Sequence, residues 1–395
     1  MTYEPKIYYF APHPIQYNVG LFREIEKIGG LCFQVIFEDD IGLVPVFEKE
    51  FNSIISWDID LLTGYNHSFV KNFGFYKISG FFSRINPAII KILFKERPDI
   101  IILHGYVTVS DWLVFFMSKL LGIKIIFRGE AVLRGIENSK NLKQRIKRFL
   151  LPKFLKQCDC ILFSCSGNKK YWKFYGVEDT KMLPVPCAVD NKYFQNERRK
   201  YEAKDLRKEL GINENDFVIL FSARFTQRKR PLDLLKSLIK IDNKDITVIF
   251  VGNGIERQKL EKFASENKIK VIFSGFVGQT YISKYYSVSD LGIVISEYDP
   301  SPKALNEAMN FELPVIVTDV IGTASDLIKE NLNGFIVNVG DIKTISEKIN
   351  FLNKNRDVAR RMGEKSFEII DKWTFERGAF WIKEAVDFVH KSKSP

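Results

Sequence analysis

The sequence predicts an α/β fold made of two doubly wound, Rossmann-like domains, and three observations support this prediction. Short runs rich in Val, Ile and Phe recur along the 395 residues, and helix-length segments separate most of them. These runs are apolar throughout rather than alternating, which is typical of parallel strands buried on both faces. The chain is also too long for one ordinary core. We therefore expect two domains that face a central cleft and bind ligands at the carboxyl ends of their strands.

The expected strands fall into two groups. The first group comprises residues 7–10, 32–37, 100–103, 123–127 and 161–163. The second group comprises residues 217–221, 246–251, 271–273, 291–295, 315–317 and 335–337. Segment 193–211 is rich in charge and poor in apolar residues, so we predict a first domain over residues 1–195 and a second over 196–373. The apolar helical segment 374–390 must pack against something, and we expect it to return to the first domain.

Composition narrows the class of partner and the compartment. The net charge of +11 indicates nucleic acid, an acidic membrane surface or a phosphorylated small molecule as partner. The five cysteines form no Cys-x-x-Cys pair and the four histidines are scattered, which favours reduced thiols over a structural zinc site. The N-terminus lacks the pattern of a signal peptide, and the longest apolar patch, 112–117, is too short to span a bilayer. We expect a cytoplasmic protein.

The stretch between the runs at 291–295 and 315–317 carries the strongest signal for a ligand. It places Asp299 in a loop at the carboxyl end of a strand and Glu307 within the following helix. Ser301 is expected to cap that helix, with Pro302 in its first turn. Free N–H groups at the helix start suit an anionic, hydroxyl-rich ligand such as a nucleotide sugar. Lys303, beside these groups, is either a further phosphate ligand or an ordinary surface lysine.

Two more loops of the second half follow predicted strands. The loop after residues 217–221 is strongly basic and contains Arg224, Arg228, Lys229 and Arg230. Clustered guanidinium and ammonium groups at this position would neutralise a diphosphate, whereas the plainer interpretation is a solvated basic loop. Gly252 and Gly254 follow the next strand and either let backbone approach a ligand closely or only make a turn.

The first half has its own candidates at the ends of predicted strands. His13 and Gln16 follow the first strand. They either contact a ligand in the expected cleft or belong to a packed turn. His104 is either a cleft residue or a satisfied buried histidine. Arg128 cannot act as a base near neutral pH but can bind a carboxylate or phosphate. Glu130 is a candidate hydrogen-bond partner or base for a ligand in the cleft. The alternative is a structural ion pair between Arg128 and Glu130.

A basic segment over residues 138–157 contains no acid. Its cations are Lys140, Lys143, Arg145, Lys147, Arg148, Lys153 and Lys156. Phenylalanine and leucine side chains are interleaved with them, as in an amphipathic helix that binds an anionic membrane surface. The alternative is a core-packed helix with a solvated basic face. No base-reading motif or aromatic platform accompanies the patch, so we do not expect nucleic acid as a partner.

The order of four motifs in the second half resembles the family 4 retaining glycosyltransferases (glycosyl transferases group 1), which have the GT-B fold. These motifs are Arg224 with Lys229-Arg230-Pro231, Val251-Gly252-Asn253-Gly254, Ser274-Gly275-Phe276-Val277, and Asp299 with Glu307 and Leu313-Pro314-Val315-Ile316. Residues 183–190 are also similar to the interdomain segment of that family. The likeness covers nearly the whole chain and is strongest after residue 180.

The resemblance implies a nucleoside-diphosphate-sugar donor bound mainly by the second domain. By this likeness Arg224 and Lys229 hold the donor diphosphate, Glu307 contacts the nucleotide ribose and Asp299 contacts the hydroxyls of the sugar. The remaining residues assigned to the donor site by the matched motifs are Gly252, Gly254, Phe276, Lys303 and Ala304. The resemblance also implies that the anomeric configuration is retained and that the protein uses no cofactor and no bound metal.

This chain departs from the family pattern at several positions. Asp299 replaces the usual Glu, with Glu297 as a competitor for the same role, and Arg128 replaces a usual His. Glu312 stands where the family commonly has Gly, and a left-handed non-Gly residue costs roughly 1–2 kcal/mol, so we expect a different turn geometry there. Asp58-Ile59-Asp60 has the form of a metal-binding Asp-x-Asp motif but lacks the rest of that pattern, and we interpret it as incidental.

The function that follows is transfer of a hexosyl unit from a nucleoside-diphosphate sugar to a hydroxyl of a lipid-linked or oligosaccharide acceptor in surface glycan synthesis. The expected location is the inner face of the cell membrane, reached through the basic segment 138–157. One alternative is a GT-B-fold sugar-nucleotide epimerase or hydrolase. The other is a non-catalytic partner subunit that binds a nucleotide sugar.

Overall fold

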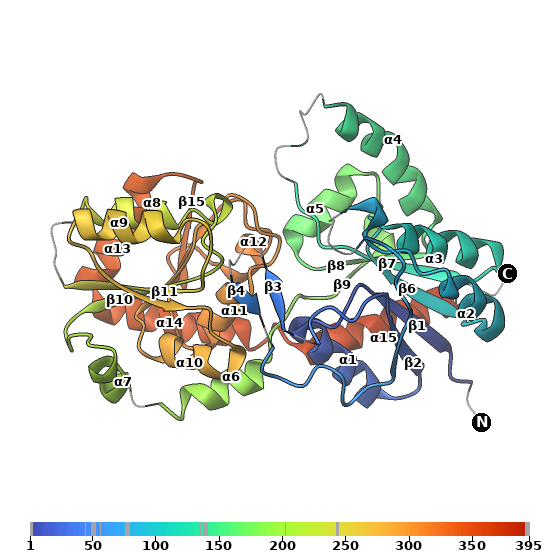
Figure 1. Cartoon of the computed structure of the whole chain (residues 1–395), viewed down its shortest axis with the longest axis horizontal. Coiled ribbons are helices and arrows are strands. Elements are labelled where there is room, and N and C mark those ends of the chain that lie inside the picture. Colours follow the sequence, from blue (N-terminus) through green and yellow to red (C-terminus); the bar gives the residue numbers. More distant parts are fainter. Residues whose placement is uncertain are drawn as a thin grey trace. The chain divides into compact units, whose positions relative to one another are not determined.

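The computed structural model describes residues 3–43, 45–48, 53–55, 57–75, 80–133, 136, 141–201, 203–241 and 245–391. These residues form two compact units (Figure 1). The first domain comprises Met1–Val44, Asp60–Cys187 and Phe375–Pro395, and the second comprises Pro45–Ile59 and Ala188–Thr374. Each domain is a parallel sheet covered by helices, which confirms the α/β fold class.

The first domain is built on a seven-stranded sheet in the order β5-β2-β1-β6-β7-β8-β9, and all of its neighbours pair in parallel. Its strands are β1 (Lys6–Ala11), β2 (Cys32–Phe37), β5 (His67–Phe69), β6 (Ile100–His104), β7 (Lys124–Arg128), β8 (Cys160–Phe163) and β9 (Met182–Pro184). The chain leaves β1 toward β2 and later returns to β6 on the other side. The topological switch point therefore lies between β1 and β6.

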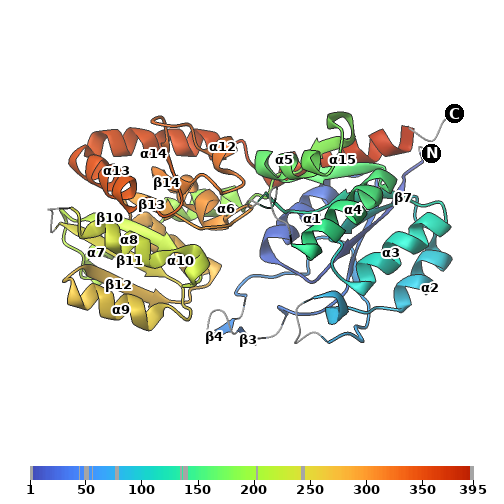
Figure 2. The same cartoon turned by 90° about the horizontal axis from the view of Figure 1, so that it is seen from above.

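Helices cover both faces of this sheet (Figure 2). They are α1 (Gln16–Ile28), α2 (Ala88–Glu96), α3 (Val109–Leu120), α4 (Leu142–Gln157), α5 (Ser166–Phe174) and α15 (Phe375–Lys391), with 3₁₀ turns η1 (Phe81–Ser83) and η3 (Asp179–Lys181). Right-handed crossovers on opposite sides of the switch point put α1 on one face and α2 to α5 on the other. Helix α15 packs on α1, where Gly20 lies directly against the Phe375 ring.

The second domain is built on a six-stranded parallel sheet in the order β12-β11-β10-β13-β14-β15. Its strands are β10 (Phe217–Ser222), β11 (Ile246–Val251), β12 (Lys270–Gly275), β13 (Leu291–Val294), β14 (Val315–Thr318) and β15 (Gly334–Val337). Its switch point lies between β10 and β13. A short antiparallel pair, β3 (Val46–Glu48) and β4 (Ser53–Ile55), groups with this domain.

The helices of the second domain alternate with these strands. They are α6 (Asn191–Arg198), α7 (Ala203–Glu209), α8 (Pro231–Leu238), α9 (Arg257–Glu266), α10 (Gln279–Ser287), α11 (Lys303–Asn310), α12 (Ala324–Leu327), α13 (Ile342–Lys354) and α14 (Arg356–Ile370), with the 3₁₀ turn η4 (Gln227–Lys229). Across the described parts of both domains, no helix combines the length and apolarity needed to cross a bilayer.

The division between the domains falls at Cys187/Ala188 rather than at residue 195. The charged stretch after residue 193 is not a linker, because α6 is anchored in the second domain by buried amides. The Asn191 amide donates to the Ile370 carbonyl at 2.8 Å and accepts from the Asn310 amide at 2.9 Å. Low apolar content here reflects surface helices held by polar contacts.

The turn at Glu312 also differs from expectation. We expected a geometry other than left-handed because this residue is not Gly, yet Glu312 has φ of 57°. Two contacts hold it there: its carboxylate pairs with Arg198, and α14 passes so close that a Cβ on Gly363 would lie 1.7 Å from the Glu312 carbonyl oxygen. The surrounding packing thus fixes a backbone conformation that the side chain disfavours.

Candidate functional site

Two loops of the second domain meet at its switch point, between β10 and β13. Lys229, in the loop after β10, forms an ion pair with Asp299, in the loop after β13, and both side chains are largely buried. The other oxygen of the Asp299 carboxylate accepts from the Ser301 backbone N–H at 3.2 Å. Parallel sheets bind ligands at this place, and here the sequence brings a cation and a carboxylate together.

The other cations of the basic loop have different roles. Arg228 donates to the Tyr298 carbonyl at 2.8 Å, and Arg230 donates to Asp233 at 2.5 Å within the start of α8. These two guanidinium groups therefore hold the loops in place. Arg224 lies two residues beyond the end of β10 and is half-buried, so it shares the edge of the sheet with Lys229.

The two glycines of the turn after β11 are required by contact with the basic loop. Gly252 has φ of 130°, and a Cβ there would lie 2.1 Å from the Ala223 carbonyl oxygen. At Gly254 a Cβ would lie 2.6 Å from the Phe225 carbonyl oxygen. Backbone therefore approaches backbone here, and the turn supports the loop that carries Arg224 and Lys229.

Helix α11 presents Glu307 from a buried position. The Glu307 carboxylate accepts from the Tyr286 hydroxyl at 2.8 Å, and the same hydroxyl lies 3.4 Å from the Ala304 carbonyl. Lys303 is the first residue of this helix. The expected Ser301 cap is wrong: Pro302 occupies the cap position, and the Ser301 hydroxyl has no hydrogen-bond partner among the described residues. Asp299 takes the turn-forming role through the Ser301 N–H instead.

Phe276 lies beyond β12, in the wall of a pocket of about 340 Å³ between α7 and α10. Asp58 stands at the start of α10, where its carboxylate accepts from the Gln279 and Thr280 N–H groups at 3.0 and 2.9 Å. Asp60 accepts from the Leu62 N–H at 2.9 Å. Both acids of the Asp-x-Asp motif are therefore occupied by backbone contacts.

In the first domain, the ends of β6 and β7 bring three of the candidate residues together. The Arg128 guanidinium is buried and lies 3.4 Å from both a Glu130 carboxylate oxygen and the Tyr9 hydroxyl. His104 Nδ1 lies 3.0 Å from the Tyr9 hydroxyl, and His104 Nε2 lies 3.8 Å from Glu130. The Cys187 thiol also donates to Glu130 at 3.0 Å.

Burial and charge set the protonation of this cluster. Burial, reinforced by the Arg128 guanidinium, lowers the pKa of His104 from 6.5 to about 4. Burial also raises the pKa of the Tyr9 hydroxyl, so both groups are neutral near pH 7. Because Arg128 donates to the Tyr9 oxygen, the Tyr9 hydroxyl can donate to His104 Nδ1, which leaves the ring proton on Nε2.

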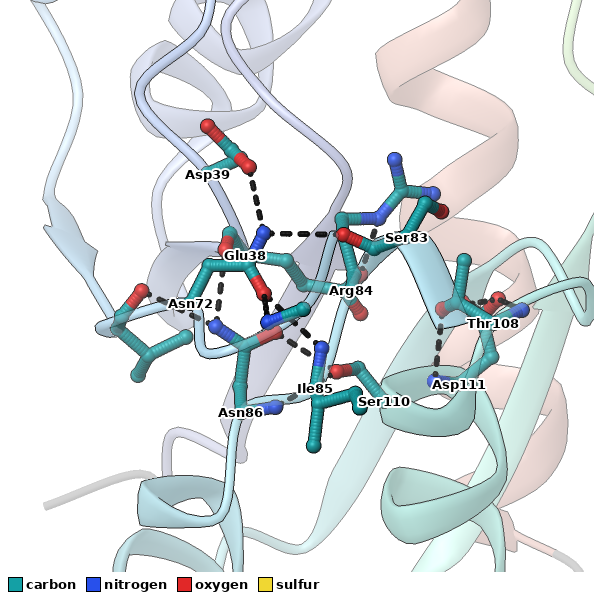
Figure 3. Close-up of polar contacts among 12 residues, drawn as sticks. Glu38, Asp39, Asn72, Ser83, Arg84, Ile85, Asn86, Thr108, Ser110 and Asp111 are labelled. Atoms are coloured by element: carbon teal, nitrogen blue, oxygen red, sulfur yellow. Dashed lines mark hydrogen bonds and ion pairs between the residues drawn. The ribbon is translucent and has the colours of Figure 1, made fainter. Parts of the chain in front are cut away.

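A second buried polar network of the first domain is shown in Figure 3, and the charges of its Arg84 and Asp39 act on His13. In this network, Arg84 Nε donates to the Glu38 carboxylate at 2.8 Å. Burial and the Arg84 charge lower the pKa of His13, so this ring is also neutral near pH 7. Two buried atoms, His13 Nδ1 and Gln16 Oε1, have no hydrogen-bond partner among the described residues.

Sequence reasoning missed the residues that orient the candidates. Tyr286 holds Glu307, and Tyr9 and Cys187 join the cluster of His104, Arg128 and Glu130. No local pattern distinguishes these side chains from ordinary core residues. Their contacts depend on which strands and helices become neighbours, which the sequence does not state.

The basic segment forms α4, and its two ends differ. Leu151, Phe154 and Leu155 of its second half are in the core, whereas residues nearer its start, Leu142, Ile146, Phe149 and Leu150, are exposed. Its exposed cations are Lys143, Arg145, Lys153 and Lys156. Arg148 is turned inward and donates to the Ile136 carbonyl at 2.5 Å. Lys140 and residues 138–139 lie outside the described residues.

Residues 202–368 match the family described as glycosyl transferases group 1. The chain is 28% identical over 174 residues to N-acetyl-alpha-D-glucosaminyl L-malate synthase of Bacillus anthracis. The aligned residues cover 43% of this chain and 45% of that protein. The chain is 24% identical to a Campylobacter jejuni alpha-1,4-N-acetyl-D-galactosaminyltransferase named for an undecaprenol-linked substrate. This alignment of 263 residues covers 64% of this chain and 68% of the relative. The alignments span about half the length of the first relatives matched.

Among solved structures, the HepE protein of Anabaena in complex with UDP and glucose matches with a TM-score of 0.72 at 15% identity, covering 97% of this chain and all of that one. This likeness shows the fold, which is the two-domain GT-B fold. Together with the match of residues 202–368, it confirms the resemblance to the glycosyl transferases group 1 and to the GT-B fold, while the family 4 subdivision and the retaining mechanism stay predictions. Residues 202–368 therefore match the glycosyl transferases group 1 family, within a chain that has the GT-B fold.

Proposed function

We propose that this protein is a retaining glycosyltransferase that moves a hexosyl unit from a nucleoside-diphosphate sugar to a hydroxyl of a lipid-linked or oligosaccharide acceptor. The observation that carries the proposal is the Lys229–Asp299 pair at the switch point of the second domain. It lies within the segment that matches the group 1 glycosyltransferases. A cation for the diphosphate and an acid for sugar hydroxyls stand together there.

The donor would take over contacts that already exist. Lys229 would exchange part of its pairing with Asp299 for the donor phosphates, and Arg224 would approach from the same edge of the sheet. Asp299 would then accept hydrogen bonds from sugar hydroxyls. Glu307, oriented by Tyr286, would accept from the ribose. The complex of HepE with UDP and glucose supports this class of ligand.

Charge stabilisation would be the main catalytic contribution of these residues. As the bond from the sugar to the diphosphate breaks, negative charge grows on the phosphate oxygens. Arg224 and Lys229 are held at the edge of the sheet before the reaction, so they would stabilise this charge with little reorganisation. Retention of configuration and independence from a metal ion are parts of the proposal that follow from the family likeness.

The first domain would supply the acceptor side. His104, Arg128 and Glu130 form one cluster there, and His13 and Gln16 offer buried polar atoms without partners among the described residues. Relatives from Campylobacter jejuni and Escherichia coli are named for undecaprenol-linked substrates. Exposed cations on α4 would bring the protein to an anionic membrane surface, where such acceptors are found.

The proposal is tested by incubating the purified full chain with a panel of nucleoside-diphosphate sugars, with and without lipid-linked and oligosaccharide acceptors. We expect nucleotide release that requires an acceptor, with the new bond in the anomeric configuration of the donor. Nucleotide release or sugar interconversion without an acceptor would favour the hydrolase or epimerase. Donor binding without turnover on any acceptor would favour the partner subunit.

A further inference from the structure

Four phenylalanines on one loop of the first domain expose large apolar side chains. The loop connects β5 to α2, and Phe73, Phe75, Phe81 and Phe82 are 61%, 64%, 48% and 61% exposed. We call residues 71–75 and 80–85 of this loop the aromatic loop. Large apolar side chains that gather on a surface mark an interaction site. This loop took no part in the function proposed above.

The aromatic loop is held together across its two arms. The Phe75 N–H donates to the Phe82 carbonyl at 2.9 Å, and the Phe73 N–H donates to the Ile85 carbonyl at 2.9 Å. Gly74 lets the arms approach, because a Cβ there would lie 2.6 Å from the Ser83 carbonyl oxygen. The described arms are therefore paired backbone, and the side chains they carry stay outside the core.

The base of the loop is fixed by the polar network of Figure 3. The Asn72 side chain accepts from the Gly74 and Ile85 N–H groups at 2.7 and 3.0 Å. Its amide donates to the Asp39 carboxylate at 2.8 Å and to the Ser83 carbonyl at 3.1 Å. Every hydrogen-bonding position of this amide is thus used to hold the loop to the end of β2.

The aromatic loop and the start of α4 lie at the same edge of the domain. Helices of a parallel α/β fold begin at the carboxyl edge of the sheet, so the first turns of α4 are at this edge. The aromatic loop is there too, since Asn72 binds the residues that follow β2. Helix α3 contacts η1 of the loop and packs on α4 through Phe115 and Phe154.

The exposed cations of α4 favour an anionic bilayer as the partner. The described residues of α4 include no acid, and the helix exposes Lys143 and Arg145 beside Ile146. In the aromatic loop the Lys71 ammonium lies 5.1 Å from the centre of the Phe73 ring. At the base of the loop, Lys71 lies with Asp39, which is hydrogen-bonded to Asn72, and with the exposed Asp40. Apolar side chains flanked by cations are the features of a surface that enters the boundary between lipid headgroups and acyl chains.

We propose that the aromatic loop inserts into the surface of an anionic lipid bilayer while α4 binds the headgroups. This deepens the proposed function, because it favours an acceptor held in a bilayer over a free oligosaccharide. The proposal rests on that function, because insertion would bring the protein to a lipid-linked acceptor. Its test, however, does not require sugar transfer. A failure of transfer and a failure of insertion are therefore seen in separate experiments.

Insertion is measured in the full chain with an environment-sensitive label at Phe82→Cys. Cys32 is the exposed cysteine and the other four are buried, so Cys32→Ser gives a background that directs a nitrobenzoxadiazole label to position 82. We expect the emission to shift to shorter wavelength on vesicles of phosphatidylcholine with phosphatidylglycerol, and lipids with a quencher on the acyl chain should quench it. An unshifted, unquenched emission from bound protein would overturn the proposal.

Vesicle binding by the variant Phe81→Ser/Phe82→Ser is the second test of insertion. Removing two exposed rings should weaken binding about tenfold or more without loss of folding. The matched control is Phe380→Ser/Phe388→Ser, which removes two exposed rings from α15 on the opposite face, and it should bind as the wild type does. Equal binding by both variants would contradict insertion. Sedimentation without vesicles covers the remaining case: self-association lost in Phe81→Ser/Phe82→Ser would identify a second copy of the chain as the partner and overturn the proposal.

Discussion

At the scale of single residues, Glu307 shows how a buried acid becomes a specific ligand. Glu307 is 4% exposed, and its carboxylate accepts from the Tyr286 hydroxyl, a contact that helps to orient it. A hydrogen bond to a charged group contributes about 1.5–3 kcal/mol. Glu307→Gln should therefore weaken donor binding by about tenfold or more. Tyr286→Phe removes the orienting contact and the hydroxyl's contact to the Ala304 carbonyl but keeps the Glu307 carboxylate, so it should weaken binding less. The two dissociation constants from calorimetry test this order, and the reverse order would contradict the assignment.

His104 gives a second prediction at this scale, in the pH dependence of stability. Its pKa is about 4 in the folded state and 6.5 in the ordinary environment of an unfolded chain. As the pH falls through this window, the unfolded state gains the proton first, so stability decreases. Between about pH 6.5 and pH 5 the loss attributable to His104 should be about 2 kcal/mol.

Urea unfolding near pH 7 and near pH 5 measures this loss. His104→Gln should reduce the pH dependence by about this amount, because no imidazole remains to titrate at position 104, whereas His13, whose pKa is also lowered by burial, still contributes. The account of the His104 cluster fails if the wild type and His104→Gln lose the same stability on acidification.

At the scale of elements, the contact between α1 and α15 depends on Gly20. A Cβ at this position would lie 2.2 Å from the Phe375 ring. Alanine otherwise stabilises a helix interior by about 1 kcal/mol relative to glycine. The sign of the change in the free energy of unfolding on Gly20→Ala therefore shows whether the helices are in contact at this position. Gly20→Ala should lower the free energy of unfolding by about 1–3 kcal/mol. Adding Phe375→Leu should recover part of that loss in a chemical denaturation series; a stabilising Gly20→Ala would show that α15 does not pack as described.

Helix α4 can be tested as an element by neutralising its exposed cations. Each cation near an anionic membrane contributes about 1 kcal/mol. Changing Lys143, Arg145, Lys153 and Lys156 to Gln should therefore weaken binding to phosphatidylglycerol-containing vesicles by on the order of a thousandfold. The control changes Lys259, Lys262, Lys343 and Lys354, which are exposed on the second domain. Sedimentation with vesicles would argue against this role of α4 if both variants bound equally.

At the scale of the whole molecule, much of the fold follows from apolar runs in the sequence. Most strands of both sheets coincide with these runs because a strand buried on both faces must be apolar throughout. The two edge strands of the first sheet, β5 and β9, are not among the predicted strands, because each has only three residues and forms no such run. Contacts between distant residues do not follow in this way. Lys229 and Asp299 are 70 residues apart, and Arg128 and Cys187 are 59 apart. Each pair exists only because the topology makes two loops neighbours.

The same reasoning explains the errors at the domain boundary and at Glu312. Charge density alone predicted a linker after residue 193, but buried amides can anchor a polar helix as firmly as an apolar face. The expectation for Glu312 considered only its own backbone preference. Packing by α14 and pairing with Arg198 outweigh that preference, and neither is visible in the local sequence.

The central claim is that a nucleoside-diphosphate sugar binds at the switch point of the second domain through Lys229. Titration calorimetry of the full chain with a panel of nucleoside-diphosphate sugars tests it most directly. The account predicts that Lys229→Ala weakens the bound donor at least about tenfold. The matched control, Lys236→Ala at an exposed position on α8, should leave the donor affinity unchanged. Unchanged donor affinity in Lys229→Ala would contradict the claim.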